Sequence, residues 1–493
     1  MSEQTVEPVQ FDFFSALPIV AQVRDIAVSS DAGILPIRQF DDQIGLTERF
    51  IGCLSETRDA AKVEHGLAQM VRQRIYGMLA GYEDCNDHDT LRGDPVFKMV
   101  SGRAPDGGAL ASQPTLSRFE NAVDIAALWR LHDFFIDDFI ASFGTPPLTV
   151  TLDIDPWDDP CHGAQQLALF NGFYDQYQYL PLMISCAETD HILWAALRPG
   201  SMHAATGADD DLATIVQRLR AAWPDVRIRV RGDAGCGVPW MYRVCERLDL
   251  DYTFGLAANA VLKRASDELL QQAVQQFEQT GRPQRRFDVF RYRAGTWPTH
   301  RTVIVKAECN AAGTNRRFLV SNRPGAADWP EACYDEYAAR GESENRNKEI
   351  KCGVAADRLS CHRFVANYFR LQMHVASLNL LVRLRRVVAD PPTLAAHGCA
   401  TGEQVPVNDP TLPPPALSEP ERRRFHNIRR RKDPLGEGHV GTWQSLLIKV
   451  AGQVIQSARR ILVTLPAAWP HIPWFQHVCA RIAALRGQPR PAT

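Results

Sequence analysis

The sequence lacks the features that mark secreted and membrane proteins. Its twelve cysteines are scattered and include no C-x-x-C pair, so no paired-cysteine motif is present. No apolar run reaches the ~20 residues that a membrane-spanning helix needs. The first residues, MSEQTVEPVQFDFF, have neither the basic start nor the apolar core of a cleavable signal sequence. These absences predict a reduced, cytoplasmic location, with most cysteines acting as small apolar side chains.

A large net charge is also absent, since the chain carries only −2 at pH 7. The distribution of charge is more informative than its sum. Acids outnumber bases in residues 1–60, whereas bases far outnumber acids in residues 281–323, and a second basic run, RRRFHNIRRRK, occupies residues 422–432. A phosphate backbone responds to such local patches, so a nucleic-acid partner remains compatible with the composition.

The chain is long enough for two or three domains, and its apolar periodicity changes along its length. Residues 1–45 alternate apolar and polar side chains around a D-A-G turn, which predicts a short β-hairpin. From about 46 to 143 the period is helical, compatible with helix-turn-helix DNA binding or with ordinary helix packing. Residues 148–260 alternate strands and helices, which predicts an α/β domain.

Two of these predicted strands end in carboxylates. The strand LTVTLDID places Asp153 and Asp155 on its polar face, together with Thr149 and Thr151. The strand VRIRVRGD ends at Asp233, before a permissive A-G-C-G turn. Hard oxygen ligands of this kind suit Mg²⁺ or Mn²⁺.

A later helix, YDEYAARGESENRNKEIK, carries a third carboxylate. With ~3.6 residues per turn, Tyr337, Arg340, Glu344, Lys348 and Lys351 share one stripe. Two interpretations are open on spacing alone. Glu344 either pairs with Arg340 or Lys348 on a solvated face, or it belongs to a site that binds a polyanion through a metal.

The spacing Y-(2)-R-(3)-E-(6)-K in this helix resembles the signature of the DDE transposases of bacterial insertion sequences. TLDIDPWDDPCHGAQ and VRGDAGCG resemble the first and second aspartate blocks of the insertion-sequence-four clan. NGFYDQYQYLPL, GYEDCNDHDTLRGDP and ANYFRLQMHVASLNLL resemble its branch called, in words, thirteen-eighty. The resemblance covers most of the chain, with its motifs in the right order.

The resemblance implies an α/β fold with an RNase H-like catalytic core, a mixed sheet flanked by helices. It also implies a β-rich insertion, a mainly helical N-terminal DNA-binding region and a C-terminal extension. The expected boundaries are 1–145 for the N-terminal hairpin and helical region, 146–262 with 331–387 for the core, 263–330 for the insertion, and 388–493 for a linker, a basic arm and the C-terminal region.

Carried over by position, the resemblance implies a catalytic, metal-binding triad of Asp155, Asp233 and Glu344. Two Mg²⁺ ions, with Mn²⁺ as a substitute, would activate water or a 3′-hydroxyl and stabilise the leaving oxygen. The first block usually reads D-x-T in the family, but here Trp157 follows Asp155-Pro156. Asp153 therefore remains an alternative first ligand.

Further residues are implied to contact DNA. On this basis Tyr337, Arg340, Lys348 and Lys351 would bind phosphates near the cleaved strand. Trp297 either packs within its hairpin or stacks on a flipped base. The basic run would contact the DNA backbone through Arg422, Arg423, Arg424, Arg429, Arg430, Arg431 and Lys432.

The function implied is a DNA transposase that cleaves and transfers strands at transposon ends, through attack by a 3′-hydroxyl and a hairpin intermediate. Its partners would be the terminal inverted repeats, target DNA and a second copy of the chain, with no membrane involved. Two alternatives remain: a metal-dependent nuclease or resolvase on the same core, and an inactive captured transposase that only binds DNA.

Overall fold

A mixed sheet of eight strands forms the centre of the computed structural model, which describes residues 7–13, 17–389, 433–436 and 438–485. The strand order is β12-β13-β14-β11-β10-β4-β8-β9. The strands are β4 (Thr149–Pro156), β8 (Leu182–Cys186), β9 (Ile192–Ala196), β10 (Arg227–Gly232), β11 (Asp251–Leu256), β12 (Gln284–Tyr292), β13 (Arg301–Asn310) and β14 (Gly313–Ser321). β4, β10 and β11 run parallel, and the other pairs are antiparallel.

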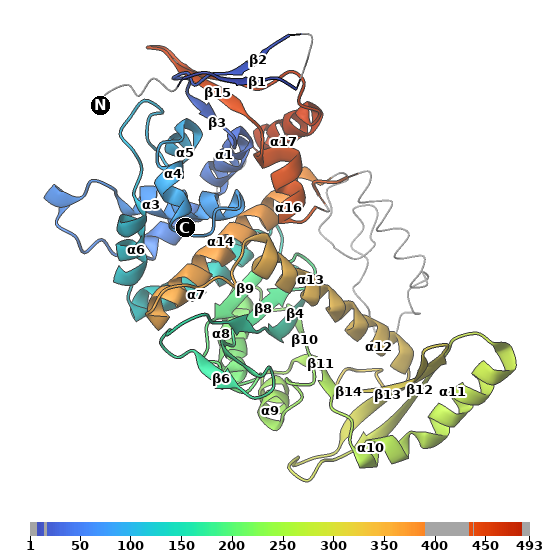
Figure 1. The fold of residues 1–493 in the computed structure, drawn as a ribbon. Coiled ribbons are helices and arrows are strands. Elements are labelled where there is room, and N and C mark those ends of the chain that lie inside the picture. Colours follow the sequence, from blue (N-terminus) through green and yellow to red (C-terminus); the bar gives the residue numbers. More distant parts are fainter. Residues whose placement is uncertain (1–6, 14–16, 390–432, 437, 486–493) are drawn as a thin grey trace.

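Helices flank this sheet, as expected for an RNase H-like core (Figure 1). On one face Val150, Leu152 and Ile154 of β4 join a buried cluster with residues of α8 (Ala208–Ala222) and α9 (Pro239–Arg247). On the other side α14 (Phe364–Val388) lies against β9. The alternation predicted for β4 is therefore confirmed, because its opposite face carries the polar side chains of Thr151, Asp153 and Asp155, which are also buried.

The helical period predicted for residues 46–143 is confirmed. The helices are α2 (Leu46–Gly52), α3 (Leu67–Leu79), α4 (Asp87–Leu91), α5 (Pro95–Val100), α6 (Gln113–Ala122) and α7 (Ile125–Ala141). α2, α3, α6 and α7 all contact α14, most of whose residues are buried. α14 therefore connects the helical region to the central sheet, because it contacts both.

The hairpin predicted around the D-A-G turn is wrong in its position. The N-terminal hairpin lies earlier, where β1 (Val9–Phe11) pairs with β2 (Ile19–Ala21). The D-A-G segment instead enters a 3₁₀ turn, Ala32–Ile34, which leads into α1 (Leu35–Ile44). Pro36 suits the first turn of a helix, and the buried Ile37 and Phe40 follow helical rather than alternating spacing.

The C-terminal elements join the N-terminal helices in one body (Figure 1). β15 (Gly452–Gln456) pairs with β16 (Ile461–Thr464) and also with β3 (Val28–Ser29). α17 (Ile472–Ala484) packs against α14 and α1, while α16 (Val440–Trp443) precedes β15.

The basic segment between Asp233 and Glu344 is strand-rich, as predicted. β12, β13 and β14 continue the core sheet, because β14 pairs with β11. α10 (Ala260–Ala265) and α11 (Asp267–Thr280) precede them, and α11 packs on β12 and β13 in a lobe that projects from the body (Figure 1). A smaller sheet contains β5 (Asp159–Pro160), β6 (Leu169–Asn171) and β7 (Gln176–Tyr179). Within the described ranges, no helix combines the length and apolar character needed to span a membrane.

Candidate functional site

Asp155 and Asp233 lie at the same edge of the central sheet. β4 and β10 are parallel neighbours with Ile154 opposite Gly232, so the next residue of each strand is an aspartate. The pKa of Asp155 is raised to about 6, mainly because the carboxyl is buried, and the negative charge of Asp233 contributes to the rise. Two carboxylates that are far apart in the sequence therefore interact.

Asp155 is held by the helical segment that follows the projecting lobe. The hydroxyl of Ser343 donates to Asp155 Oδ2 at 3.0 Å, and Asn347 Nδ2 donates to the same oxygen at 2.8 Å. A guanidinium nitrogen of Arg340 lies 3.8 Å from that oxygen. These contacts fix the side chain at the mouth of the site and leave Asp155 Oδ1 with none of these donors.

Asp233 is oriented by its own turn. Its Oδ1 accepts from the backbone N–H of Gly235 at 2.9 Å and of Cys236 at 3.3 Å. Glycine at 255 permits the close approach of the neighbouring strand, because a Cβ there would lie 2.9 Å from Tyr337 Oη and 3.0 Å from the carbonyl carbon of Asp233. Tyr337, at the end of α12 (Pro330–Ala338), therefore lies close to the turn that follows Asp233.

Asp153 has quite different surroundings, although it shares a strand face with Asp155. It is buried, and both of its oxygens accept from Arg231, at 2.7 and 2.9 Å. Arg346 forms a second ion pair with Asp153 and also binds Asp190 at 2.8 Å. Two guanidinium groups therefore already neutralise the carboxylate of Asp153 without a metal ion.

The segment predicted as one regular helix changes its winding around Glu344. α12 passes into a 3₁₀ turn (Ala339–Gly341), then α13 (Glu342–Lys348), then a π-helical turn (Glu349–Gly353). The π-helical turn is anchored because Glu349 accepts from Arg385 of α14 and from the backbone N–H of Val440, the latter at 3.1 Å. Irregular winding of this kind occurs often at functional sites.

Glu344 lies on α13 directly after Ser343, but its side chain is exposed, as is that of Lys348. The neighbouring carboxylates of Asp155 and Asp233 meet without it. In the part of the chain that the structure describes, no group of three or more His, Cys, Asp or Glu side chains is arranged to hold a metal ion. The structure therefore brings two of the three predicted acids together and places the third on the helix above them.

The remaining members of the stripe take separate positions. The Arg340 guanidinium lies over the Tyr337 ring, 5.6 Å from its centroid, and faces Asp155. Lys351 Nζ pairs with Asp158 at 3.0 Å. Arg340 therefore lies beside Asp155, whereas Lys351 is paired with Asp158, and contact of either cation with phosphate stays a prediction.

Trp297 is buried in the core. Its ring packs edge-on against Tyr242 at 5.2 Å and Tyr292 at 5.5 Å, and Arg301 lies 5.5 Å from its centroid. In this conformation its faces are occupied by protein, so base stacking by Trp297 stays a prediction. The basic run at 422–432 lies outside the described residues.

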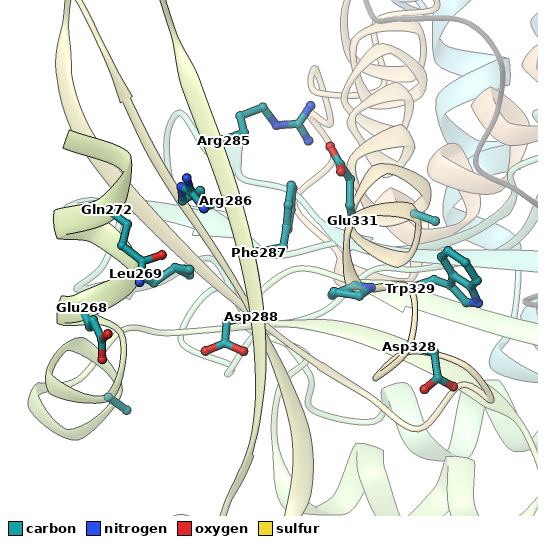
Figure 2. Close-up of a pocket in the computed structure, with 13 residues that line it drawn as sticks. Glu268, Leu269, Gln272, Arg285, Arg286, Phe287, Asp288, Asp328, Trp329 and Glu331 are labelled. Atoms are coloured by element: carbon teal, nitrogen blue, oxygen red, sulfur yellow. The ribbon is translucent and has the colours of Figure 1, made fainter. Parts of the chain in front are cut away.

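An open cleft of about 760 Å³ lies in the projecting lobe, away from the carboxylates (Figure 2). Its walls come from the end of α10, α11, β12, the residues just before α12 and the first turn of α12, and they carry acids and bases together. The labelled charged residues are Glu268, Arg285, Arg286, Asp288, Asp328 and Glu331. Its volume does not make it the candidate site, because none of Asp155, Asp233 and Glu344 lines it.

Sequence reasoning missed four side chains that build the site: Arg231, Ser343, Arg346 and Asn347. Helical spacing could have found two of them, since Ser343 and Asn347 lie three and seven residues after Arg340 and share its face. The role of Arg231 and Arg346 depends on the pairing of distant elements, which spacing alone does not give.

The donor set is compatible with a divalent cation. Asp155 and Asp233 offer hard carboxylate oxygens. The amide oxygen of Asn347, whose nitrogen binds Asp155, is buried without a hydrogen-bond partner among the described residues. A cation would relieve the repulsion between the carboxylates, which Arg340 offsets only from 3.8 Å.

The comparisons with known proteins agree with this chemistry. A search of curated proteins gave no match. The family model described as transposase DDE domain, group 1, matches residues 11–401, which is most of the chain. The protein therefore belongs to the DDE-domain transposases of group 1.

Proposed function

We propose that this transposase cuts and joins DNA strands at a site formed by Asp155, Asp233 and Glu344. The observation that carries the proposal is the meeting of Asp155 and Asp233 at the ends of adjacent parallel strands, beneath α13. Glu344 is the third acid because it follows Ser343, whose hydroxyl binds Asp155.

Asp155, Asp233 and Glu344 would hold two Mg²⁺ ions, or Mn²⁺ in their place. When bound, these ions supply Lewis acidity and lower the pKa of a nucleophilic water or hydroxyl. Asp155 is the first ligand rather than Asp153, because Arg231 and Arg346 already occupy the oxygens of Asp153. Ser343 and Asn347 orient Asp155 through its Oδ2.

The cations of the chain act on the substrate. Arg340, Lys348 and Lys351 neutralise phosphates beside the cleaved bond, and Tyr337 supports Arg340 through its ring. In the first step water attacks the phosphodiester at the transposon end, the bond to the 3′ oxygen breaks, and a 3′-hydroxyl is released. In the second step that hydroxyl attacks another phosphodiester, the bond from its phosphorus to the 3′ oxygen breaks, and the attacked strand leaves with a free 3′-hydroxyl. The new bond closes a hairpin in the donor end or joins the strand to target DNA.

The assembly is the one that the family resemblance implies. A homodimer would hold two terminal inverted repeats in the cytoplasm, and the N-terminal helices and the run 422–432 would add contacts to the DNA backbone. A nuclease or resolvase on the same core is the second candidate, favoured by the same carboxylates. A captured, inactive DNA-binding protein has no use for two carboxylates that would face phosphates.

The test is strand cleavage on a duplex that carries the inverted repeat flanking the coding sequence. With Mg²⁺ or Mn²⁺ we expect nicking at the repeat boundary, followed by a hairpin or a joined product. Glu344→Gln should abolish both steps, whereas Glu342→Gln, on the same helix, should not. Nicking that persists in Glu344→Gln would remove Glu344 from the mechanism, and nicking without any joined or hairpin product would favour the nuclease.

A further inference from the structure

A turn with four exposed aromatic side chains borders the carboxylates. It comprises residues 170–177, which include the end of β6, the connection and the start of β7, and it is called here the aromatic turn. The exposed fractions are 47% for Phe170, 87% for Phe173, 37% for Tyr174 and 63% for Tyr177. The rings form two edge-on pairs, Phe173 with Tyr174 at 4.9 Å and Phe170 with Tyr177 at 5.5 Å. Phe173 therefore presents most of its ring to solvent, an unusual position for so large an apolar group.

The backbone of the aromatic turn is built to hold these rings outward. Asn171 is buried, and its Oδ1 accepts from the backbone N–H of Phe173 at 3.0 Å and of Tyr174 at 3.3 Å. Its Nδ2 donates to the carbonyl of Gly200 at 2.6 Å. Glycine is required at 200, because a Cβ there would lie 2.0 Å from the carbonyl oxygen of Gln178. The turn is thus fixed to the core.

Two observations place the aromatic turn beside the proposed catalytic site. Gln176 donates to Asp158 at 3.4 Å, and Asp158 in turn pairs with Lys351 at 3.0 Å. The pKa of Tyr174 is raised, first by burial and then by the charges of Asp158, Asp233 and Asp155. The phenol therefore lies within electrostatic reach of both catalytic aspartates.

The chemistry of the aromatic turn suits a base rather than a phosphate. The stretch FNGFYDQY contains no Lys or Arg and one acid, Asp175, so it cannot attract a phosphate backbone. Exposed aromatic faces bind nucleobases by stacking, and this is possible only for a base that has left the helical stack.

We propose that the aromatic turn stacks on an unpaired nucleobase next to the scissile phosphodiester, with Phe173 and Tyr174 as the contacting rings. The inference rests on the proposed function, since it needs DNA at the carboxylates. The stacked base would hold the strand in place while the phosphodiester lies against Asp155 and Asp233. Phe173 and Tyr174 are thus positioning residues.

The test compares binding to two duplexes with Ca²⁺ in place of Mg²⁺. One carries the flanking inverted repeat, and the other has an abasic site at the two positions on either side of the cleaved bond. On the intact duplex we expect Phe173→Ala to lose about tenfold in affinity. On the abasic duplex wild type and variant should bind alike, and Phe173→Trp should restore binding to the intact duplex. Leu148→Ala, which removes an apolar side chain 72% exposed just before β4, at the end of the strand opposite to Asp155, is the control and should change nothing.

The outcomes separate the two proposals. A loss of equal size on the abasic duplex, or a change in oligomeric state in Phe173→Ala, would assign the turn to the fold or to a protein partner and overturn base stacking. If wild type nicks DNA normally while Phe173→Ala and Tyr174→Ala bind both duplexes as wild type does, the stacking inference fails and the proposed function stands. A wild-type chain that neither binds nor nicks the duplex would overturn both.

Discussion

Asp153 and Asp155 are two residues apart on the same face of β4, yet they belong to different regions of the molecule. Asp153 lies in a buried ion cluster with Arg231, Arg346 and Asp190. Asp155 lies at the mouth of the site, where Ser343 and Asn347 bind one oxygen and Arg340 remains 3.8 Å away. The negative charge of Asp153 is compensated by two guanidinium groups, whereas that of Asp155 is offset only by Arg340 from 3.8 Å.

The difference teaches how one strand can carry both a structural and a chemical carboxylate. Paired charges in the interior hold β4, β10 and α13 together. Asp155, at the end of the strand, has a pKa raised to about 6, mainly because the carboxyl is buried and in part because Asp233 is negatively charged. Perturbed acids of that kind are candidates for binding a cation, and the following predictions test the contrast.

The largest effect is expected on catalysis. Asp155→Asn and Asp233→Asn should each lower Mg²⁺-dependent strand cleavage by at least about a thousandfold, because several kcal/mol of charge stabilisation would be lost. Both variants should fold, as judged by circular dichroism and gel filtration. Cleavage that survives in only one of the two variants would show that the aspartate substituted there is not needed for Mg²⁺-dependent cleavage.

Asp153 should affect stability instead. Asp153→Ala leaves the buried Arg231 without its carboxylate and Arg346 with Asp190 alone, so the free energy of unfolding should fall by about 3–5 kcal/mol. Urea unfolding measures this loss. Asp158→Ala, which removes a partly exposed ion pair, is the control and should cost less than about 1 kcal/mol. Equal losses for both variants would contradict the buried cluster.

A third prediction concerns pH. The pKa of Asp155 is about 6 in the folded chain against an ordinary value of 3.8, so the folded state holds an extra proton between these values. Stability should therefore fall as pH rises from 4 to 6, to a cost of about 2–3 kcal/mol at pH 7. Metal-free Asp155→Asn should escape this cost, being more stable than wild type at pH 7 and equal to it near pH 4. Thermal unfolding at both pH values checks the sign, and a less stable variant at pH 7 would refute it.

The smallest effect is expected at Lys348, which is exposed on α13. If it contacts one phosphate, Lys348→Ala should lower the slope of log affinity against log salt by ~0.9 and leave folding unchanged. Fluorescence anisotropy at several salt concentrations gives this slope. An unchanged slope would show that Lys348 contacts no phosphate and stays solvated in the complex.

Much of the fold follows from local pattern. The strand β4 and the helical period of residues 46–143 follow from apolar periodicity, and the structure confirms both. The hairpin predicted around D-A-G failed because short alternation does not separate a strand from a helix whose first turn contains Pro36. The pairing of β15 with β3 joins residues from opposite ends of the chain, which no local pattern reveals.

The site was predictable in part. Spacing and resemblance singled out Asp155 and Asp233, and the parallel pairing of β4 with β10 brings them together. The choice between Asp153 and Asp155 needed three-dimensional contacts, because Arg231 and Arg346 reach Asp153 from different elements. The burial of Trp297 likewise depends on tertiary packing that its hairpin sequence does not encode.

The central claim is that Asp155 and Asp233, with Glu344, hold divalent cations against DNA, whereas Asp153 does not. Electron paramagnetic resonance of Mn²⁺ titrated into the complex of the protein with its inverted-repeat duplex tests it most directly. We expect wild type to bind two Mn²⁺ ions, and Asp155→Asn, Asp233→Asn and Glu344→Gln each to lose at least one of them. Undiminished Mn²⁺ binding in Asp155→Asn would contradict the claim.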